Sequence, residues 1–344
     1  MNEVEFISSY KFSKIADVVY SGIFLEEQIR DLNLKNFKVL QKNQDYLEIK
    51  TKEFELKENF IIFSRIDDLE GLFYLLKNVN LENIKLISHQ SDKSITEKLY
   101  KSKPKCISSW FSVNIDIIKD DLISIPIGLA NNHPKNLSPN DFTTIKNTNN
   151  LFFSNYKEKE IIYVNFQKST NYKEREKIYN FFSKFEWAKV QNPNQDKKIY
   201  LKNLNEIFFT LTPFGNGFDT HRFWEALYSG SVPVLKYHKS YEYAKDLPVL
   251  FIDEYSNITE DYLLNEIPTL VNKSYNFEKL YFDYWEKSIK NNNLPSIASS
   301  FINSDIAVVK FFEIKNLFVI KINSYKKIIF YYLRKIKGYF SSQT

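Results

Sequence analysis

Apolar residues in this chain form short continuous runs that alternate with stripes spaced three and four apart. The run 207–211 is typical of a strand buried on both faces. The segment 68–79 instead carries Leu and Phe at helical spacing after an aspartate that can cap a helix. Strands that alternate with helices favour a mainly parallel sheet, so the predicted fold class is α/β.

The same reading covers most of the chain. The predicted strands are 37–40, 59–65, 84–89, 105–110, 122–127, 161–166, 207–211, 232–235 and 249–253. The predicted helices are 68–79, 94–102, 172–185, 195–205, 241–247, 259–271 and 277–290, with a further short helix between a cap at residue 219 or 220 and Gly230.

A polar stretch, 131–150, is rich in Asn, Pro, Ser and Thr and is the clearest linker. It divides the chain into an amino-terminal α/β domain, 1–150, and a carboxyl-terminal α/β domain, 151–309, followed by a basic helical tail, 310–344. A chain of 344 residues is long enough for two such domains. We therefore predict two Rossmann-like domains that face a cleft.

The segment 207–236 reads as a strand, a glycine loop, a short helix and a second strand. Gly215 and Gly217 allow backbone conformations and close approaches that a side chain would block. Asp219 or Thr220 can cap the helix, and Gly230 is placed to end it. In an α/β sheet this loop lies at the carboxyl end of a strand, where ligands bind.

Polar residues cluster at the loop and at the first helical turn. Unpaired backbone N–H groups and the helix dipole favour an anion there, and the guanidinium of Arg222 suits a diphosphate. Glu225, one turn beyond His221, could reach a sugar hydroxyl. The alternative is a surface helix whose Arg and Glu face solvent. The predicted anion-site residues are Gly215, Asn216, Gly217, Asp219, Thr220, His221, Arg222 and Glu225.

The motif G-N-G-x-D-T-H-R-x-W-E-A-L-x-x-G-x-V-P-V, which starts at Gly215, resembles the donor-site signature of exostosin-like (family 47) glycosyltransferases and their bacterial relatives. More loosely, it is similar to the T-E-K-x-x-x-A-L-x-x-G-x-V-P segment of GDP-fucose-using fucosyltransferases. The resemblance implies a GT-B fold and transfer of a sugar from a nucleotide-sugar (NDP-sugar) donor. It also implies an inverting reaction. Outside the motif the likeness is patchy.

The start of the second domain, N-F-x-x-x-T-N-x-x-x-R, also resembles the bacterial exostosin-like group. Lys168 and Arg175 could supply a second cation for the phosphates of the donor. Against this, Arg175 stands among Lys173, Glu174 and Lys177, a pattern typical of a solvated helix face.

An inverting transfer needs a general base that accepts the proton of the acceptor hydroxyl. Asp67, His89 and Asp92 follow predicted strands of the first domain and are the candidates. Capping of the next helix would also explain Asp92. The pair Asp253-Glu254, at another strand end, is a further candidate for a base or for contact with the ribose.

The net charge of +5 is concentrated in the tail. From Lys310 onward there are eight basic residues and one acid, which leaves the body near neutral and argues against nucleic acid as a partner. An apolar stripe at steps of three and four also runs along the tail, which favours contact with an anionic membrane surface. A helix packed across the two domains is the alternative. The stripe comprises Phe311, Ile314, Phe318, Ile322, Tyr325, Ile329, Leu333, Ile336 and Phe340.

Several absences narrow the prediction. The sequence has no Asp-x-Asp triplet and no zinc-ligand spacing, so we expect no metal and no cofactor besides the NDP-sugar co-substrate. No signal peptide or run of roughly 18 apolar residues is found, and Cys106 is the lone cysteine. We therefore expect a cytoplasmic enzyme that is peripheral on the inner face of the cell membrane.

The predicted function is a glycosyltransferase that acts on a glycan or lipid-linked acceptor in surface polysaccharide synthesis. The first domain would bind the acceptor and the second the donor. Two other classes remain open: another nucleotide-sugar enzyme, such as a hydrolase or epimerase, and a non-catalytic glycan-binding or membrane-binding protein.

Overall fold

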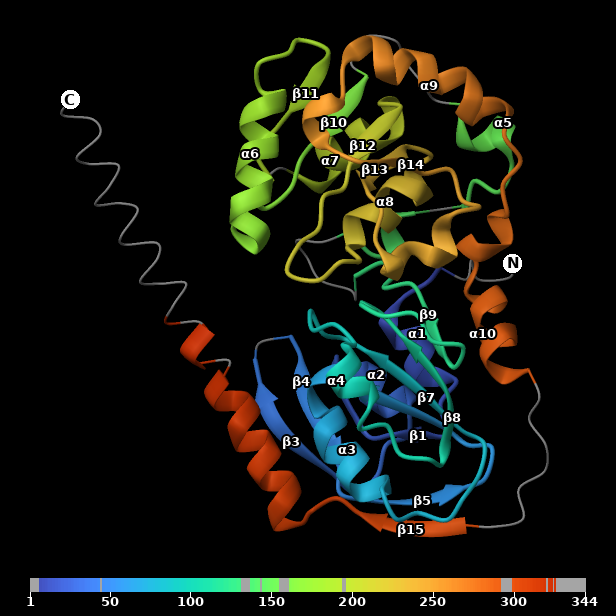
Figure 1. Cartoon of the computed structure of the whole chain (residues 1–344), viewed down its shortest axis with the longest axis vertical. Coiled ribbons are helices and arrows are strands. Elements are labelled where there is room, and N and C mark those ends of the chain that lie inside the picture. Colours follow the sequence, from blue (N-terminus) through green and yellow to red (C-terminus); the bar gives the residue numbers. More distant parts are fainter. Residues whose placement is uncertain are drawn as a thin grey trace, which may run out of the picture.

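A computed structural model describes residues 6–43, 45–130, 137–142, 144–154, 161–193, 196–291, 299–319, 321–323 and 325. Within these ranges the chain forms two parallel five-stranded sheets with helices around them (Figure 1). The α/β class with two Rossmann-like sheets is therefore confirmed.

The first sheet has the strand order β1-β6-β7-β8-β9, and all its pairs are parallel. Every residue of β6 and β7 is buried, because both faces of these strands are covered. The strands are β1 (Val18–Val19), β6 (Ile61–Arg65), β7 (Ile84–His89), β8 (Ile107–Ser112) and β9 (Leu122–Ser124). The helices of this half are α1 (Ser9–Lys14), α2 (Glu26–Asp31), α3 (Leu69–Leu76) and α4 (Glu97–Tyr100).

Antiparallel strands extend this half beyond what the sequence predicts. A three-stranded sheet has the order β2-β4-β3, and a two-stranded sheet pairs β15 with β5. The predicted strand 37–40 is confirmed as β3, but it lies in the antiparallel sheet. The bounds are β2 (Ser21–Phe24), β3 (Phe37–Lys42), β4 (Leu47–Thr51), β5 (Glu53–Lys57) and β15 (Ser299–Asn303).

The second sheet has the parallel order β11-β10-β12-β13-β14. The order reverses between β10 and β12, which makes the loops after these two strands the topological switch point. The strands are β10 (Ile162–Val164), β11 (Ala188–Val190), β12 (Phe209–Leu211), β13 (Val232–Lys236) and β14 (Leu250–Ile252). The helices are α5 (Asn149–Phe152), α6 (Tyr172–Phe182), α7 (Lys197–Glu206), α8 (His221–Ser229) and α9 (Glu260–Asn272).

Three predicted helices differ in detail from the structure. The predicted helix 94–102 shortens to α4, and 241–247 is instead a 3₁₀ segment, Lys239–Ala244. The predicted helix 277–290 divides into a 3₁₀ turn, Phe277–Leu280, and α10 (Phe282–Lys290).

The carboxyl ends of the strands in the two sheets face one another (Figure 1). Hydrogen bonds link the two halves there, from Asp219 N to Asn114 Oδ1 (2.9 Å) and from Ser124 Oγ to Ser240 O (2.7 Å). One cluster of buried apolar side chains extends through both halves.

After α10 the chain returns to the first half. Lys85 Nζ donates to the Ile289 carbonyl at the end of α10 (2.7 Å), β15 pairs with β5, and residues 307–319 form a helix. This helix lies beside β3 and α3 (Figure 1). The described part of the tail, up to residue 319, therefore packs on the first half; the alternative of a helix across both domains stays open for the rest of the tail. The predicted boundary at residue 309 stays a prediction.

Candidate functional site

The loop 212–220 connects β12 to α8 at the switch point of the second sheet. Thr220 occupies the N-cap position of α8, but its side chain makes no capping hydrogen bond. Gly230 ends α8 in the left-handed conformation at φ 79°, as predicted. The first-turn N–H groups of α8 thus lack a side-chain cap at the edge of the sheet where α/β proteins bind ligands.

Arg175 of α6 holds this loop in shape. Its guanidinium donates to the carbonyls of Phe214 (2.8 Å) and Pro213 (2.7 Å), and also to Gln167 O (2.9 Å) and Thr170 Oγ1 (2.7 Å). The interpretation of this residue as part of a solvated helix face is wrong, because Arg175 is only 4% exposed. Burial, together with the charge of Arg222, lowers the pKa of Arg175 to about 10.

The two loop glycines allow close approaches. A Cβ at Gly215 would lie 3.3 Å from Arg175 Nη2, and one at Gly217 would lie 2.7 Å from Asn114 Nδ2. Gly217 therefore allows the loop to touch the first half, where Asn114 accepts a hydrogen bond from Asp219 N. Asn216 reaches the same half, because its Nδ2 donates to Asp92 Oδ2 (3.1 Å).

Arg222 lies at the first turn of α8 and is half-buried. Its Nε is buried without a hydrogen-bond partner, and its guanidinium carbon is 5.8 Å from the centre of the Tyr200 ring. Within the part of the chain that the structure describes, no carboxylate pairs with it. An arginine left unpaired beside an uncapped helix start can bind an anion.

Glu225, one turn further along α8, is buried and accepts a hydrogen bond from the Tyr200 hydroxyl on α7 (2.7 Å). Burial raises the pKa of Tyr200 well above its usual value, with Glu225 adding to the rise, so the phenol stays protonated and donates. Arg222, Glu225 and Tyr200 thus form one group on α7 and α8.

Asp219 and His221 turn toward the first half. Asp219 Oδ2 accepts from Ile127 N (2.8 Å) and from the Tyr243 hydroxyl (2.8 Å), and His221 Nδ1 is 2.8 Å from Gly128 O. Burial raises the pKa of Asp219 to about 6 despite these hydrogen bonds. These two side chains therefore fix the position of α8 against the first half.

The three candidate bases differ in their surroundings. Asp92 is exposed and touches Asn216 of the glycine loop. Asp67 pairs with Lys93 (2.8 Å) and lies 3.4 Å from Arg65. Burial acts to raise the pKa of Asp67, but Arg65 and Lys93 outweigh it and hold the value below the usual range.

His89 is completely buried. Gln90 N donates to its Nδ1 (2.8 Å), so Nε2 carries the proton toward Pro126 O (3.2 Å). Burial lowers the pKa of His89 to about 3, which keeps the ring neutral. Its surroundings are those of a core residue.

The remaining candidates are Glu254, Asp253 and Lys168, and only Glu254 reaches a separate cavity of about 430 Å³ beside α6. Glu254 lines it and pairs with Lys236 (2.8 Å), while Asp253 is exposed. Lys168 follows β10 and lies over the Tyr179 ring at 4.4 Å. No group of three potential metal ligands occurs among the described residues.

Sequence reasoning missed Asn114 and Tyr200. Asn114 follows β8 with a positive φ of 54°, and asparagine tolerates this conformation better than most residues. An asparagine just after a buried strand could therefore have indicated a loop residue of the site. No sequence feature pointed to Tyr200, because a single tyrosine on a polar helix does not stand out.

Comparisons with known proteins add little. No protein-family model matches the chain, and no curated protein does. The chain is similar to a solved structure of AviGT4, described as a glycosyltransferase involved in avilamycin A biosynthesis, with 11% identity over 67% of this chain and 79% of that chain. The TM-score of 0.30 is too low to support a conclusion, so the fold assignment rests on the strand order given above.

Proposed function

We propose that this chain is a glycosyltransferase of GT-B type that binds the diphosphate of an NDP-sugar at the start of α8. This proposal is carried by Arg222, which has no ion pair among the described residues, beside the uncapped first turn. The location supports it, because the loop lies at the switch point of a parallel sheet. The motif that resembles exostosin-like enzymes begins in this same loop.

The donor would extend from this point along α8. Gly215, Asn216 and Gly217 would offer backbone close to the phosphates, and Glu225 would accept a ribose hydroxyl while Tyr200 orients it. Lys168, on the loop after β10, is the second cation that we propose. Arg175 would act through the loop that it holds, since at least four of its N–H groups are used on protein oxygens.

The proposed reaction is an inverting displacement. The acceptor oxygen forms a bond to the anomeric carbon as the bond from that carbon to the diphosphate breaks, and the nucleoside diphosphate leaves with the electron pair. Arg222 would stabilise the charge on the leaving group. Asp92 is the preferred base, because it is exposed and touches the donor loop, and it would take the proton of the acceptor hydroxyl.

Asp67 is a second candidate base, although its ion pairs keep it a weak one. We do not propose a proton-transfer role for His89, because its buried ring cannot reach a substrate.

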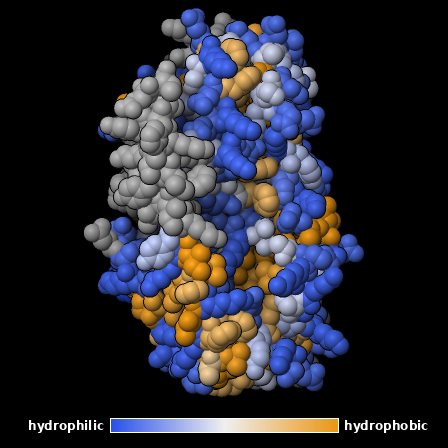
Figure 2. All heavy atoms as spheres, turned by 60° about the vertical axis from the view of Figure 1, so that its left-hand side comes forward, coloured by the Kyte–Doolittle hydropathy of each residue, from blue (hydrophilic) through white to orange (hydrophobic). Residues whose placement is uncertain are grey.

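We also propose that the tail brings the enzyme to an anionic membrane surface, which suits a glycan or lipid-linked acceptor. The residues Phe311, Ile314 and Phe318 are 62%, 65% and 65% exposed on the helix 307–319. Figure 2 shows apolar residues gathered on this face of the molecule. Among the described residues, no helix is long and apolar enough to span a bilayer. The stripe positions 329, 333, 336 and 340 lie outside the described residues.

Donor binding can be tested with UDP-, GDP- and CMP-sugars by thermal shift and calorimetric titration. We expect one of them to stabilise the protein, and Arg222→Ala to weaken its binding about tenfold or more, the effect of losing a charge-assisted hydrogen bond. Lys184→Ala, which removes an exposed cation after α6, is the control and should bind normally. Normal binding by Arg222→Ala would contradict the proposal.

A further inference from the structure

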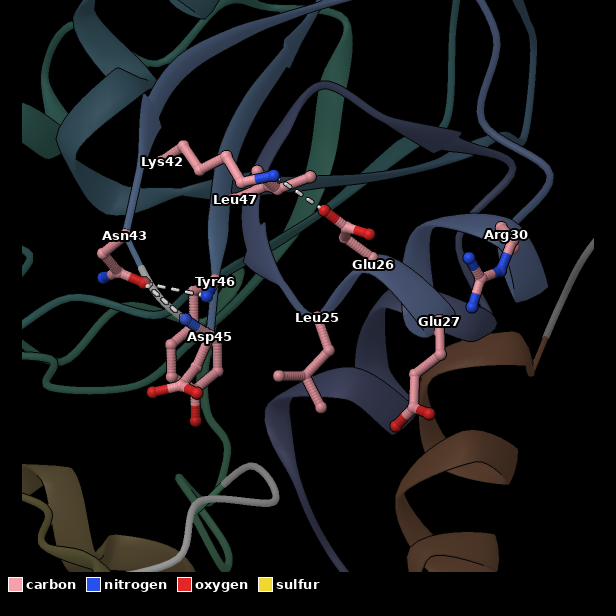
Figure 3. A pocket seen from close by; sticks show the side chains of 9 residues that line it. All are labelled: Leu25, Glu26, Glu27, Arg30, Lys42, Asn43, Asp45, Tyr46 and Leu47. Carbon is pink, nitrogen blue, oxygen red and sulfur yellow. Dashed lines mark hydrogen bonds and ion pairs between the residues drawn. The ribbon is translucent and has the colours of Figure 1, made fainter.

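A cavity of about 400 Å³ opens in the first half between α2 and the β3–β4 hairpin. Figure 3 shows α2 on one side with Glu26, Glu27 and Arg30, and the hairpin on the other with Asp45 and Tyr46. Cavities of this size hold small ligands, including one or two sugar rings. Nothing in the proposed donor site uses these residues.

Strand directions place this cavity at the edge of the first sheet that faces the second half. β1 runs parallel to β6, and the chain continues in that direction into β2, where Ser21 Oγ accepts from Arg65 N (3.1 Å). Phe24, at the end of β2, pairs with Leu47 at the start of β4. Leu25 and Leu47, both in the cavity wall, therefore lie at the carboxyl end of the sheet.

Residues next to the cavity wall are bonded to segments that carry the candidate bases. Ile23, two residues before the wall residue Leu25, donates through its N–H to Gln90 Oε1 (2.7 Å), and Gln90 is two residues before Asp92. On the other wall, Glu48 follows Leu47 and pairs with Arg65, which lies 3.4 Å from Asp67. Asp92 in turn touches Asn216 of the glycine loop. Hydrogen bonds and short stretches of backbone thus connect the cavity to the segment of the preferred base, which itself touches the proposed donor loop.

The lining matches a ligand rich in hydroxyl groups. Glu26 pairs with Lys42 (2.9 Å), whereas Glu27 and Arg30 form no ion pair with any described residue. A free carboxylate accepts hydrogen bonds from hydroxyls, and a free guanidinium donates to them. Tyr46 adds an aromatic ring, and burial raises its pKa, so its hydroxyl stays a donor.

We infer that this cavity binds the glycan end of the acceptor and presents its hydroxyl to Asp92. The inference rests on the proposed function, since it assigns the acceptor side of the same reaction. A neutral polyhydroxylated ligand fits best, because the lining holds three carboxylates and two cations.

Methyl glycosides of glucose, galactose, rhamnose and N-acetylglucosamine serve as probes for saturation-transfer NMR with the full chain. We expect at least one to bind the wild type, and Glu27→Ala/Arg30→Ala to weaken it about tenfold. The matched control is Glu55→Ala/Lys57→Ala, which removes an exposed acid–base pair on β5, away from this edge. Tyr46→Ala provides a second variant should the first unfold.

Nucleotide binding, measured on the same proteins, separates the two proposals. Glycoside binding that is lost in the cavity variant while nucleotide binding persists would support the inference. If no glycoside binds, or if the cavity variant binds as the wild type does, the acceptor cavity is wrong even where a nucleotide binds. A wild type that binds a glycoside but no nucleotide would contradict the donor proposal alone.

Discussion

At the scale of single residues, the polar groups around the first turn of α8 divide between two tasks. Asp219 and His221 bind Ile127 and Gly128 of the first half, whereas Arg222 has no ion pair among the described residues. These two preceding residues hold the start of α8, which carries Arg222, against the first half. A binding group that is already positioned loses less conformational entropy when its ligand arrives.

His89 gives a pH test at this scale. Its pKa is about 3 in the folded protein, against about 6.5 in an unfolded chain. As the pH falls below 6.5, the unfolded chain gains a proton at His89 that the folded chain accepts only near pH 3. Acidification therefore favours unfolding, by at most about 1.4 kcal/mol for each pH unit in this window.

We expect His89→Gln to lose this part of the pH dependence, because glutamine does not titrate and can still bond to Pro126 O. The measurement is the free energy of unfolding in urea at several pH values between 3 and 7, for both proteins. Other groups, including Asp219, titrate in both proteins, so their contributions cancel when the unfolding free energy of the variant is subtracted from that of the wild type. Parallel curves for the two proteins would show that His89 is not held neutral.

At the scale of elements, the helix 307–319 has two unlike faces. Its inner face is bound to the first half, where Glu313 lies 3.1 Å from the buried Lys50 Nζ and Asn316 Nδ2 donates to Asp67 O (2.6 Å). Its outer face carries the exposed stripe of Phe311, Ile314 and Phe318. A helix that is anchored by polar contacts and leaves apolar groups in water needs a partner for its outer face.

The stripe predicts that the protein sediments with anionic vesicles. Vesicles of phosphatidylcholine mixed with phosphatidylglycerol should bind it better than phosphatidylcholine alone, because the basic tail adds an electrostatic attraction. Ile314→Glu/Phe318→Glu should lower binding about tenfold or more, since burial of each side chain is worth roughly 1.5–3 kcal/mol.

Ile118→Glu/Leu151→Glu is the matched control, because these side chains are also exposed but lie outside the tail. If both double variants bind vesicles equally well, the stripe is not a lipid-binding face. The same conclusion follows if the stripe variant binds vesicles normally and changes only the oligomeric state of the protein in sedimentation.

The elements that were predicted correctly are those set by residues close together in the sequence. The unit from β12 to β13 was predicted because its apolar runs form the strands and Gly230 ends the helix between them. The pairing of β15 with β5 was missed, because it joins segments more than 240 positions apart. Arg175 was misread for the same reason: its partners are backbone carbonyls 38 and 39 positions further along the chain.

At the scale of the whole molecule, the two halves share one buried core and meet through hydrogen bonds at Asn114. This side chain accepts from Asp219 N across the interface and donates to Ser91 O (3.0 Å) within its own half. Because Ser91 precedes the preferred base, the contact that joins the halves also fixes the base against the donor loop.

This arrangement predicts one cooperative unfolding transition for both halves in calorimetry, with equal calorimetric and van't Hoff enthalpies. Asn114→Ala should keep one transition but lower the free energy of unfolding by about 1–3 kcal/mol more than Asn33→Ala, because buried partners lose their hydrogen bonds. Asn33 is the matched control, since it also has a positive φ (48°) but is exposed. Two separate transitions in the wild type would mean that the halves are stable independently. Equal losses of unfolding free energy in the two variants would mean that Asn114 does not hold the base and the donor loop together.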